Sequence, residues 1–184
     1  MKPSNLQVHI RAEIFNPQGK LIKRIPWKRA NSYVQQLIDL LYRHLSVGSL
    51  AVTDTSGAAV GTIRTLYTFR ATSGADNTNY GIVIGTGTNP VLVGDYKLQT
   101  QVVTNIAHSS VSVSAPVTDG TTRKVEIVRT FTNNTGSALN ITEVGLYLTG
   151  HSETAYHCID RSLYNVTINN GESASLRYRI KVTV

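Results

Sequence analysis

The stretch from Val125 to Leu148 constrains the fold most, because it predicts two β-strands joined by a polar connection. Both arms are rich in β-branched and aromatic residues, which favour strands, whereas residues 132–137 carry the Asn, Gly, Ser and Thr typical of turns. The second arm ends in the apolar run Val144 to Leu148, as expected of a strand covered on both faces. We therefore predict a β-hairpin in the interior of a sandwich, with Leu146 buried.

Strands are expected along most of the remaining chain. Residues 6–15 alternate between apolar and polar, the turn residues Asn16 to Gly19 follow, and a second strand runs from Leu21 to Trp27. Pro26 cannot donate to a strand ladder, so this second strand is expected to lie at an edge or to end there. The sequence Asn169-Asn170-Gly171 predicts a hairpin between the last two strands. Further strands are predicted over residues 62–70, 81–84, 106–117, 155–160, 162–168 and 173–184.

One helix is expected from about Tyr33 to Leu45, where a capping box precedes apolar residues at helical spacing. A β-hairpin and this helix would occupy residues 6–46, and small and polar residues predict a flexible loop region over 46–79. A chain of 184 residues can bury a core as one domain, 1–184. The predicted fold is mainly β, an antiparallel β-sandwich or jelly-roll-like fold with one N-terminal α-helix.

The sequence contains no motif that predicts catalysis or metal binding. Gly85 and Gly87 follow a strand as in a phosphate-binding loop, but the third glycine is absent and Pro90 prevents the helix that would hold the phosphate. A tight turn that needs positive φ is the alternative. Glu143 and Asp160 are a conceivable carboxylate pair, although nothing in the sequence brings them together. We expect no enzyme activity, no catalytic residue, no cofactor and no metal.

Three further features limit the class of protein. The five histidines do not occur at metal-ligand spacing, and the single cysteine, Cys158, is expected to be a buried apolar residue. The sequence has no run of 18 apolar residues that would span a membrane. Residues 1–15 lack the apolar segment of a secretion signal, so we expect no secretion signal at this end.

Positive charge is concentrated near the N-terminus. Residues 1–50 contain eight Lys or Arg against Glu13 and Asp39, which leaves +6 of the total net charge of +7. A basic run predicts contact with phosphates or with an acidic protein face. The alternative is an edge strand whose lysines only discourage unwanted pairing. The candidate basic interaction surface consists of Lys20, Lys23, Arg24, Lys28 and Arg29.

Three segments together resemble small virion structural proteins of tailed bacterial viruses. These segments are ANSYV at residues 30–34, GIVIGTGTNPVLVGDYKLQTQV at 81–102, and NITEVGLYL at 140–148, which is followed by a C-terminal strand after NGES. The resemblance implies a non-enzymatic subunit of a capsid, a tail or a fibre attachment, which is made in the host cytoplasm and located in the virion. Its partners would be further copies of itself, as a homo-oligomer, and other virion proteins, without a membrane. Nucleic acid is a possible partner of the basic N-terminal hairpin.

Two alternative functions remain at this point. A carbohydrate-binding or receptor-binding β-sandwich on a viral fibre would need exposed aromatic residues, and Tyr80 and Tyr96 are the tyrosines outside strand-like runs. A basic protein that contacts nucleic acid would rest on the basic run alone. Assembly through repeated interfaces suits the low charge content and the long β-hairpins best.

Overall fold

The computed structural model describes residues 5–30, 52–60, 70–149 and 155–183, and within these ranges it contains strands and no helix. The helix predicted from about Tyr33 to Leu45 lies outside the described residues, as does the strand predicted over 62–70 except for Arg70. The strands are β1 (Asn5–Phe15), β2 (Leu21–Arg29), β3 (Val52–Thr53), β4 (Ala59–Val60), β5 (Gly81–Gly85), β6 (Ile106–His108), β7 (Ser112–Val113), β8 (Val117–Asp119), β9 (Thr122–Asn133), β10 (Leu139–Thr149), β11 (Tyr156–Ile168) and β12 (Ser173–Thr183).

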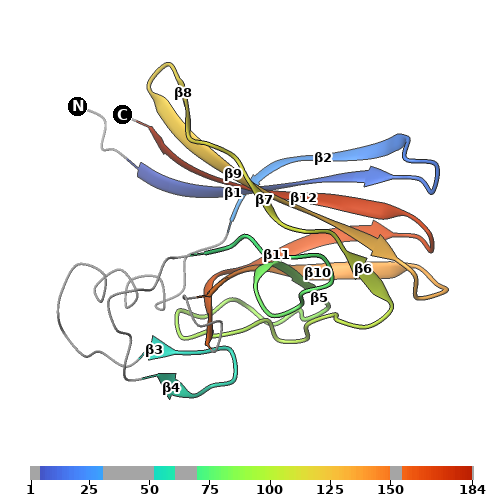
Figure 1. Ribbon diagram of the computed structural model, residues 1–184, viewed down its shortest axis with the longest axis horizontal. Coiled ribbons are helices and arrows are strands. Elements are labelled where there is room, and N and C mark those ends of the chain that lie inside the picture. Colours follow the sequence, from blue (N-terminus) through green and yellow to red (C-terminus); the bar gives the residue numbers. More distant parts are fainter. Residues whose placement is uncertain (1–4, 31–51, 61–69, 150–154, 184) are drawn as a thin grey trace.

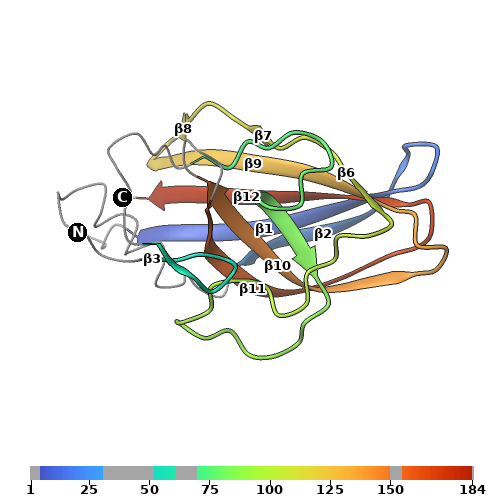
Figure 2. The ribbon, with the colours of Figure 1, turned by 60° about the horizontal axis from the view of Figure 1, so that its bottom comes forward.

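Two antiparallel sheets face each other across a shared apolar core (Figure 1). The large sheet has the order β2-β1-β12-β9-β6, and β7 and β8 pair with the same strand β9. The small sheet has the order β11-β10-β5, and its strands cross those of the large sheet obliquely (Figure 2). The prediction of a mainly β, antiparallel fold is therefore confirmed, and the two facing sheets are compatible with a β-sandwich.

The N-terminal hairpin forms as predicted, with β2 at the edge of the large sheet. β2 continues past Pro26 to Arg29 because the proline lies in a β-bulge. The pairs Ile10–Lys28 and Ala12–Ile25 enclose one residue on β1 and two on β2. The missing N–H of Pro26 therefore leaves no gap in a regular ladder.

The connection between β9 and β10 crosses from one sheet to the other, so the hairpin predicted for Val125 to Leu148 is wrong. β9 pairs with β12, whereas β10 pairs with β5 and β11. Asn133 ends β9, and its side-chain amide donates to the carbonyl oxygens of Ser137 at 2.7 Å and Ile168 at 2.9 Å. This buried side chain satisfies carbonyl groups that a hairpin ladder would have paired.

The connection between β11 and β12 makes the same crossing, so the hairpin predicted at Asn169 to Gly171 is also wrong. The two connections lie side by side and bond to each other. Gly171 N donates to Asn133 O at 2.7 Å, and Gly136 N donates to the side-chain oxygen of Asn170 at 2.8 Å. Each turn thus supplies acceptors for the other, which replaces the cross-strand bonds of two separate hairpins.

β10 is the middle strand of the small sheet and is covered on both faces, as its apolar run predicts. Val144, Leu146 and Leu148 belong to the main core between the sheets. Tyr147 points the other way and packs with a smaller outer cluster that includes Leu98 and the buried Cys158. Residues 86–100, here called the covering loop, lie over this outer face (Figure 2).

Leu146 provides a test of the core. Its side chain is completely buried, so we expect Leu146→Ala to lower the free energy of unfolding by about 2–5 kcal/mol, through lost apolar burial and a residual cavity. Urea unfolding followed by tryptophan fluorescence measures this change. A loss below about 0.5 kcal/mol would be typical of a surface position and would contradict the placement of β10.

The predicted loop region 46–79 is partly described. Val52–Thr53 and Ala59–Val60 pair as a short hairpin, β3–β4. The Asp54 carboxylate holds its turn by accepting from the backbone N–H groups of Ser56 and Ala58, both at 2.9 Å. Residues 46–51 and 61–69 lie outside the described residues.

Candidate interaction surface

The five predicted basic residues do not form one surface, because β2 presents them on two sides of the large sheet. Lys28 pairs in register with Ile10 and Lys23 with Ile14, and both isoleucines face the core. Arg24 pairs with Glu13 on the opposite side. The other two residues are Arg29, which pairs with His9 on the side of Arg24, and Lys20, which follows the turn.

The outer side of the large sheet collects arginines from the hairpin β1–β2 and from β12, which is distant in sequence. Arg177 of β12 pairs with Arg11 of β1, and Arg179 of β12 pairs with His9. Because residues paired across an antiparallel ladder share a face, these side chains lie beside those of β2. We call this surface the basic face; it consists of Arg11, Arg24, Arg29, Arg177, Arg179 and Lys181.

Two carboxylates lie within the basic face, and each serves several arginines. Glu13 is 6% exposed and lies 2.9 Å from Arg24 Nε and 3.4 Å from the guanidinium of Arg11. Glu126 of β9 lies 2.6 Å from Arg179. Arg177 lies between the two carboxylates, at 3.7 and 3.8 Å, which is too long for strong hydrogen bonds.

Trp27 organises the centre of the basic face. The guanidinium of Arg179 lies 3.9 Å from the centre of its ring, and that of Arg11 lies 5.0 Å away. Such cation–π contacts hold the two guanidiniums in place. Burial lowers the pKa of the neighbouring His9, and the positive charges of Lys181, Arg179 and Arg29 lower it further.

Most of the basic face was not predicted from the sequence, because its cations are not close to one another in the sequence. The signal was present in a different form. Arg177, Arg179 and Lys181 alternate with apolar residues in the last strand, and this period places all three on one side of a sheet. Only the order of the strands brings them next to Arg11, since β1 and β12 are neighbours in space but not in sequence.

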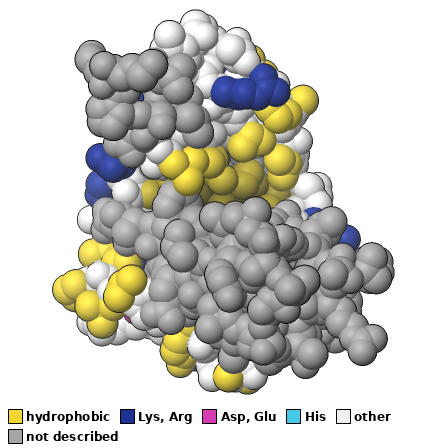
Figure 3. Space-filling model, turned by 90° about the vertical axis from the view of Figure 1, so that its left-hand side faces the viewer, with side chains coloured by type: hydrophobic (Ala, Val, Ile, Leu, Met, Phe, Trp, Pro, Cys, Tyr) yellow, Lys and Arg dark blue, Asp and Glu magenta, His cyan; other side chains and the backbone are white. Residues whose placement is uncertain are grey.

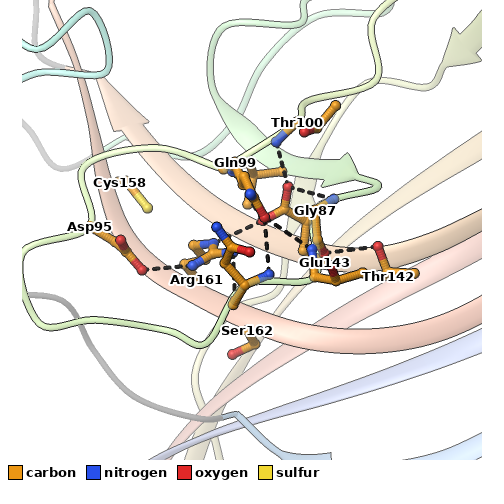
Figure 4. Close-up of polar contacts among 12 residues, drawn as sticks. Gly87, Asp95, Gln99, Thr100, Thr142, Glu143, Cys158, Arg161 and Ser162 are labelled. Carbon is orange, nitrogen blue, oxygen red and sulfur yellow. Dashed lines mark hydrogen bonds and ion pairs between the residues drawn. The ribbon is translucent and has the colours of Figure 1, made fainter.

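A second polar cluster lies on the outer face of the small sheet, beneath the covering loop (Figure 4). The buried Glu143 carboxylate accepts from the backbone N–H groups of Gly87 at 3.1 Å, Gln99 at 3.1 Å and Thr100 at 2.8 Å. It also accepts from Arg161 Nε at 2.8 Å. Three of these donors belong to the covering loop, and the fourth belongs to β11. The carboxylate therefore holds the loop on the sheet.

Arg161 extends the same cluster into the covering loop. It donates to the carboxylate of Asp95 at 2.8 Å and to the carbonyl oxygens of Asn89 at 3.1 Å and Pro90 at 3.3 Å. The guanidinium therefore connects Glu143 at the sheet with the far side of the loop (Figure 4).

Gly85 and Gly87 allow this close approach, and neither adopts the positive φ expected from the tight-turn interpretation. A Cβ on Gly85 would lie 2.5 Å from the carbonyl oxygen of Thr100, and one on Gly87 would lie 2.5 Å from the Glu143 carboxylate. The N–H of Gly87 already binds that carboxylate. The two glycines thus serve internal packing in place of the phosphate contact considered from the sequence.

Asp160 lies on the other face of the small sheet from Glu143 and forms no pair with it. Its Oδ2 atom accepts from the hydroxyls of Tyr178 at 3.0 Å and Ser162 at 3.1 Å, between the two sheets. Its Oδ1 atom is buried without a hydrogen-bond partner. Burial raises the pKa of Asp160 to about 7, although hydrogen bonds from Tyr178 and Ser162 oppose the shift.

The two tyrosines considered for ligand binding do not form an exposed aromatic platform. Tyr80 is 4% exposed and stacks on Tyr156 with 5.7 Å between ring centres. Tyr96 is partly exposed, and the ammonium of Lys97 lies 5.6 Å from its ring centre. These positions give no support to a carbohydrate site built on Tyr80 and Tyr96.

Within the ranges that the structure describes, no group of three or more His, Cys, Asp or Glu side chains is placed to hold a metal ion. The same part of the chain has no helix that is long and apolar enough to cross a membrane. No protein-family model matches the chain, and comparison with curated proteins and with solved structures finds no significant similarity.

Proposed function

We propose that the protein is a non-enzymatic structural subunit of a virion, which self-assembles or docks on neighbouring subunits of a capsid or tail through repeated interfaces. The virion part of the proposal rests on the resemblance of residues 30–34, 81–102 and 140–148 to small structural proteins of tailed bacterial viruses. The interface part rests on one structural observation, which is the display of two apolar side chains on the covering loop.

Leu92 and Val93 are 65% and 71% exposed at the tip of this loop. The loop is not free to collapse around them, because Leu92 N donates to the Asp95 carboxylate at 2.8 Å and Arg161 binds that same carboxylate. Exposed apolar side chains on a rigidly held loop suit an interface anchor, since little conformational freedom remains to be lost on binding.

The end of the molecule where β1 begins and β12 ends offers a second apolar surface. Figure 3 shows hydrophobic side chains gathered on this end, with Lys and Arg side chains near them. Leu6 of β1 and Val117 of β8 are 50% and 52% exposed. Apolar surface at two separate places suits a subunit with more than one neighbour.

The buried carboxylates support a structural role in place of a catalytic one. Glu143 binds three backbone N–H groups and one guanidinium, and Asp160 binds two hydroxyl groups between the sheets. Both groups therefore connect parts of the fold to each other.

Assembly tests this proposal. We expect the purified protein to form a stable oligomer, or larger order visible by electron microscopy, and expect the double variant Leu92→Ser/Val93→Ser to shift it towards the monomer. Because both side chains are exposed, the free energy of unfolding should change by less than about 0.5 kcal/mol. Size-exclusion chromatography with light scattering measures the mass.

Val103→Ser/Val113→Ser is the matched control, since these valines are 47% and 42% exposed at other positions. It should assemble like the parent. A parent protein that stays monomeric at high micromolar concentration would contradict the proposal, and so would equal loss of assembly in both double variants.

A further inference from the structure

We propose that the basic face binds the phosphodiester backbone of nucleic acid, without selecting a base sequence. The surface differs from the basic hairpin suggested by the sequence. It excludes Lys23 and Lys28, which lie on the core side of the sheet, and it includes Arg11, Arg177 and Arg179 from other strands.

The basic face has an excess of positive charge. The basic face carries six cationic side chains, and the two carboxylates within it are Glu13 and Glu126. Lys124 of β9 lies opposite Lys181 in the ladder. It is not counted in the basic face, because its ammonium group lies 3.4 Å from the carboxylate of Asp119. An excess of positive charge on a broad sheet surface attracts a polyanion and releases its counterions on binding.

Most cations of the basic face are arginines, which suit phosphate binding. Five of the six cationic side chains are arginines, whose planar guanidinium binds phosphate oxygens through two parallel hydrogen bonds. Arg177 is held only loosely by its carboxylates, at 3.7 and 3.8 Å, and Arg29 is exposed at the end of β2. These guanidiniums have donors left for a ligand.

The cations of the basic face are regularly spaced, and some of them are held in place. Alternate residues on one strand are about 7 Å apart and neighbouring strands about 5 Å apart, so cations on one side of a sheet form a regular array. Trp27 fixes part of this array by its contacts with Arg179 and Arg11. A repeating anion can contact several of these positions at once, whereas a single small anion can use only one or two.

An acidic protein is the competing partner, and the composition of the basic face is less suited to it. Stable protein interfaces have an apolar centre with aromatic anchors that enter the partner. Here the central aromatic residue is Trp27, and two guanidiniums of the same chain already contact its ring. The charges of the surface point to phosphate recognition.

Two double variants of β2 test the inference with matched charge. Arg24→Gln/Arg29→Gln removes two cations from the basic face, and Lys23→Gln/Lys28→Gln removes two cations from the opposite side of the same strand. Binding is measured by fluorescence anisotropy with a labelled oligothymidylate at several salt concentrations. We expect the parent affinity to fall steeply with salt, as phosphate contacts require.

The arginine variant should bind at least about tenfold more weakly than the parent and show a smaller salt slope, by about 0.7 for each lost contact, whereas the lysine variant should lose less than about threefold. Equal losses in the two variants would reduce the effect to net charge and overturn the inference. It would also be overturned if the parent did not bind at low salt, or bound polyglutamate as tightly as the oligonucleotide.

Two further variants separate folding from binding and this inference from the proposed function. Arg29→Gln alone changes an exposed side chain, and a binding loss in it without a change in thermal unfolding supports direct contact. Leu92→Ser/Val93→Ser alters the proposed assembly site and leaves the basic face intact. That variant should bind the oligonucleotide like the parent, so either proposal can fail without the other.

Discussion

Glu143→Gln is expected to lower the free energy of unfolding by about 3–5 kcal/mol, because it leaves the buried guanidinium of Arg161 without its fully buried charged partner. The substitution keeps the size of the side chain, but an amide nitrogen would replace one of two carboxylate oxygens that each accept two hydrogen bonds. Urea unfolding of parent and variant, with equal slopes, gives the difference.

Asp95→Asn is the matched control, because Asp95 binds the same guanidinium from a position at which its side chain is 21% exposed. Its loss should cost no more than about 1 kcal/mol, since water can replace a partly exposed ion pair. If the two substitutions had equal effects, or if Glu143→Gln changed stability by less than about 1 kcal/mol, the covering loop would not depend on the buried carboxylate.

Asp160→Asn is expected to remove most of the pH dependence of stability that Asp160 causes in the parent protein. Burial raises the pKa of Asp160 to about 7 in the folded protein, against an ordinary pKa of 3.8. Between about pH 4 and 7 the unfolded chain has lost this proton while the folded protein keeps it. The folded state therefore binds more protons, and the Asp160 contribution to stability falls as the pH rises through this window.

Asparagine stays neutral at every pH in this range. The free energy of unfolding of the variant should therefore rise relative to that of the parent from pH 4 to pH 8. The expected gain is on the order of 4 kcal/mol, from about three pKa units. Urea unfolding at pH 4, 6 and 8 measures it. Tyr178→Phe should extend the pH dependence of the parent upwards, because it removes a hydroxyl that donates to the carboxylate. A parent–variant difference that stays constant with pH would place the Asp160 pKa near its ordinary value.

The alternation of residues predicted which faces of the strands are buried, but it could not predict which strands pair. Arg129 illustrates the difference. It shares the period of Val125, Ile127 and Phe131 in the sequence, and it is indeed completely buried. Its partners are the carbonyl oxygens of Ser109 and Ile82, at 3.0 Å each, and backbone acceptors from segments distant in sequence leave no trace in composition. Burial also lowers the pKa of Arg129 to about 10.

The turns show a similar limit. Asn-Gly sequences identify where the chain reverses, but a reversal within one sheet and a crossing between two sheets use the same residue types. In the crossing between the sheets, the side chain of Asn133 donates a hydrogen bond to the carbonyl oxygen of Ile168. Composition does not reveal this contact. The basic face was only partly predicted for the same reason, since a charge run on β2 is visible in the sequence and its neighbours on β12 are not.

The position of β12 between β1 and β9 has a consequence for how the protein is made. Residues 5–15 must wait for residues 173–183 before their second neighbour exists, because β12 follows every other described strand in the chain. During synthesis the N-terminal hairpin therefore has an unpaired edge, and pairings over such sequence distances form slowly. Closure of the large sheet therefore waits until β12 has been synthesised. The basic face, which needs arginines from β1, β2 and β12 together, then exists only after β12 has joined the sheet.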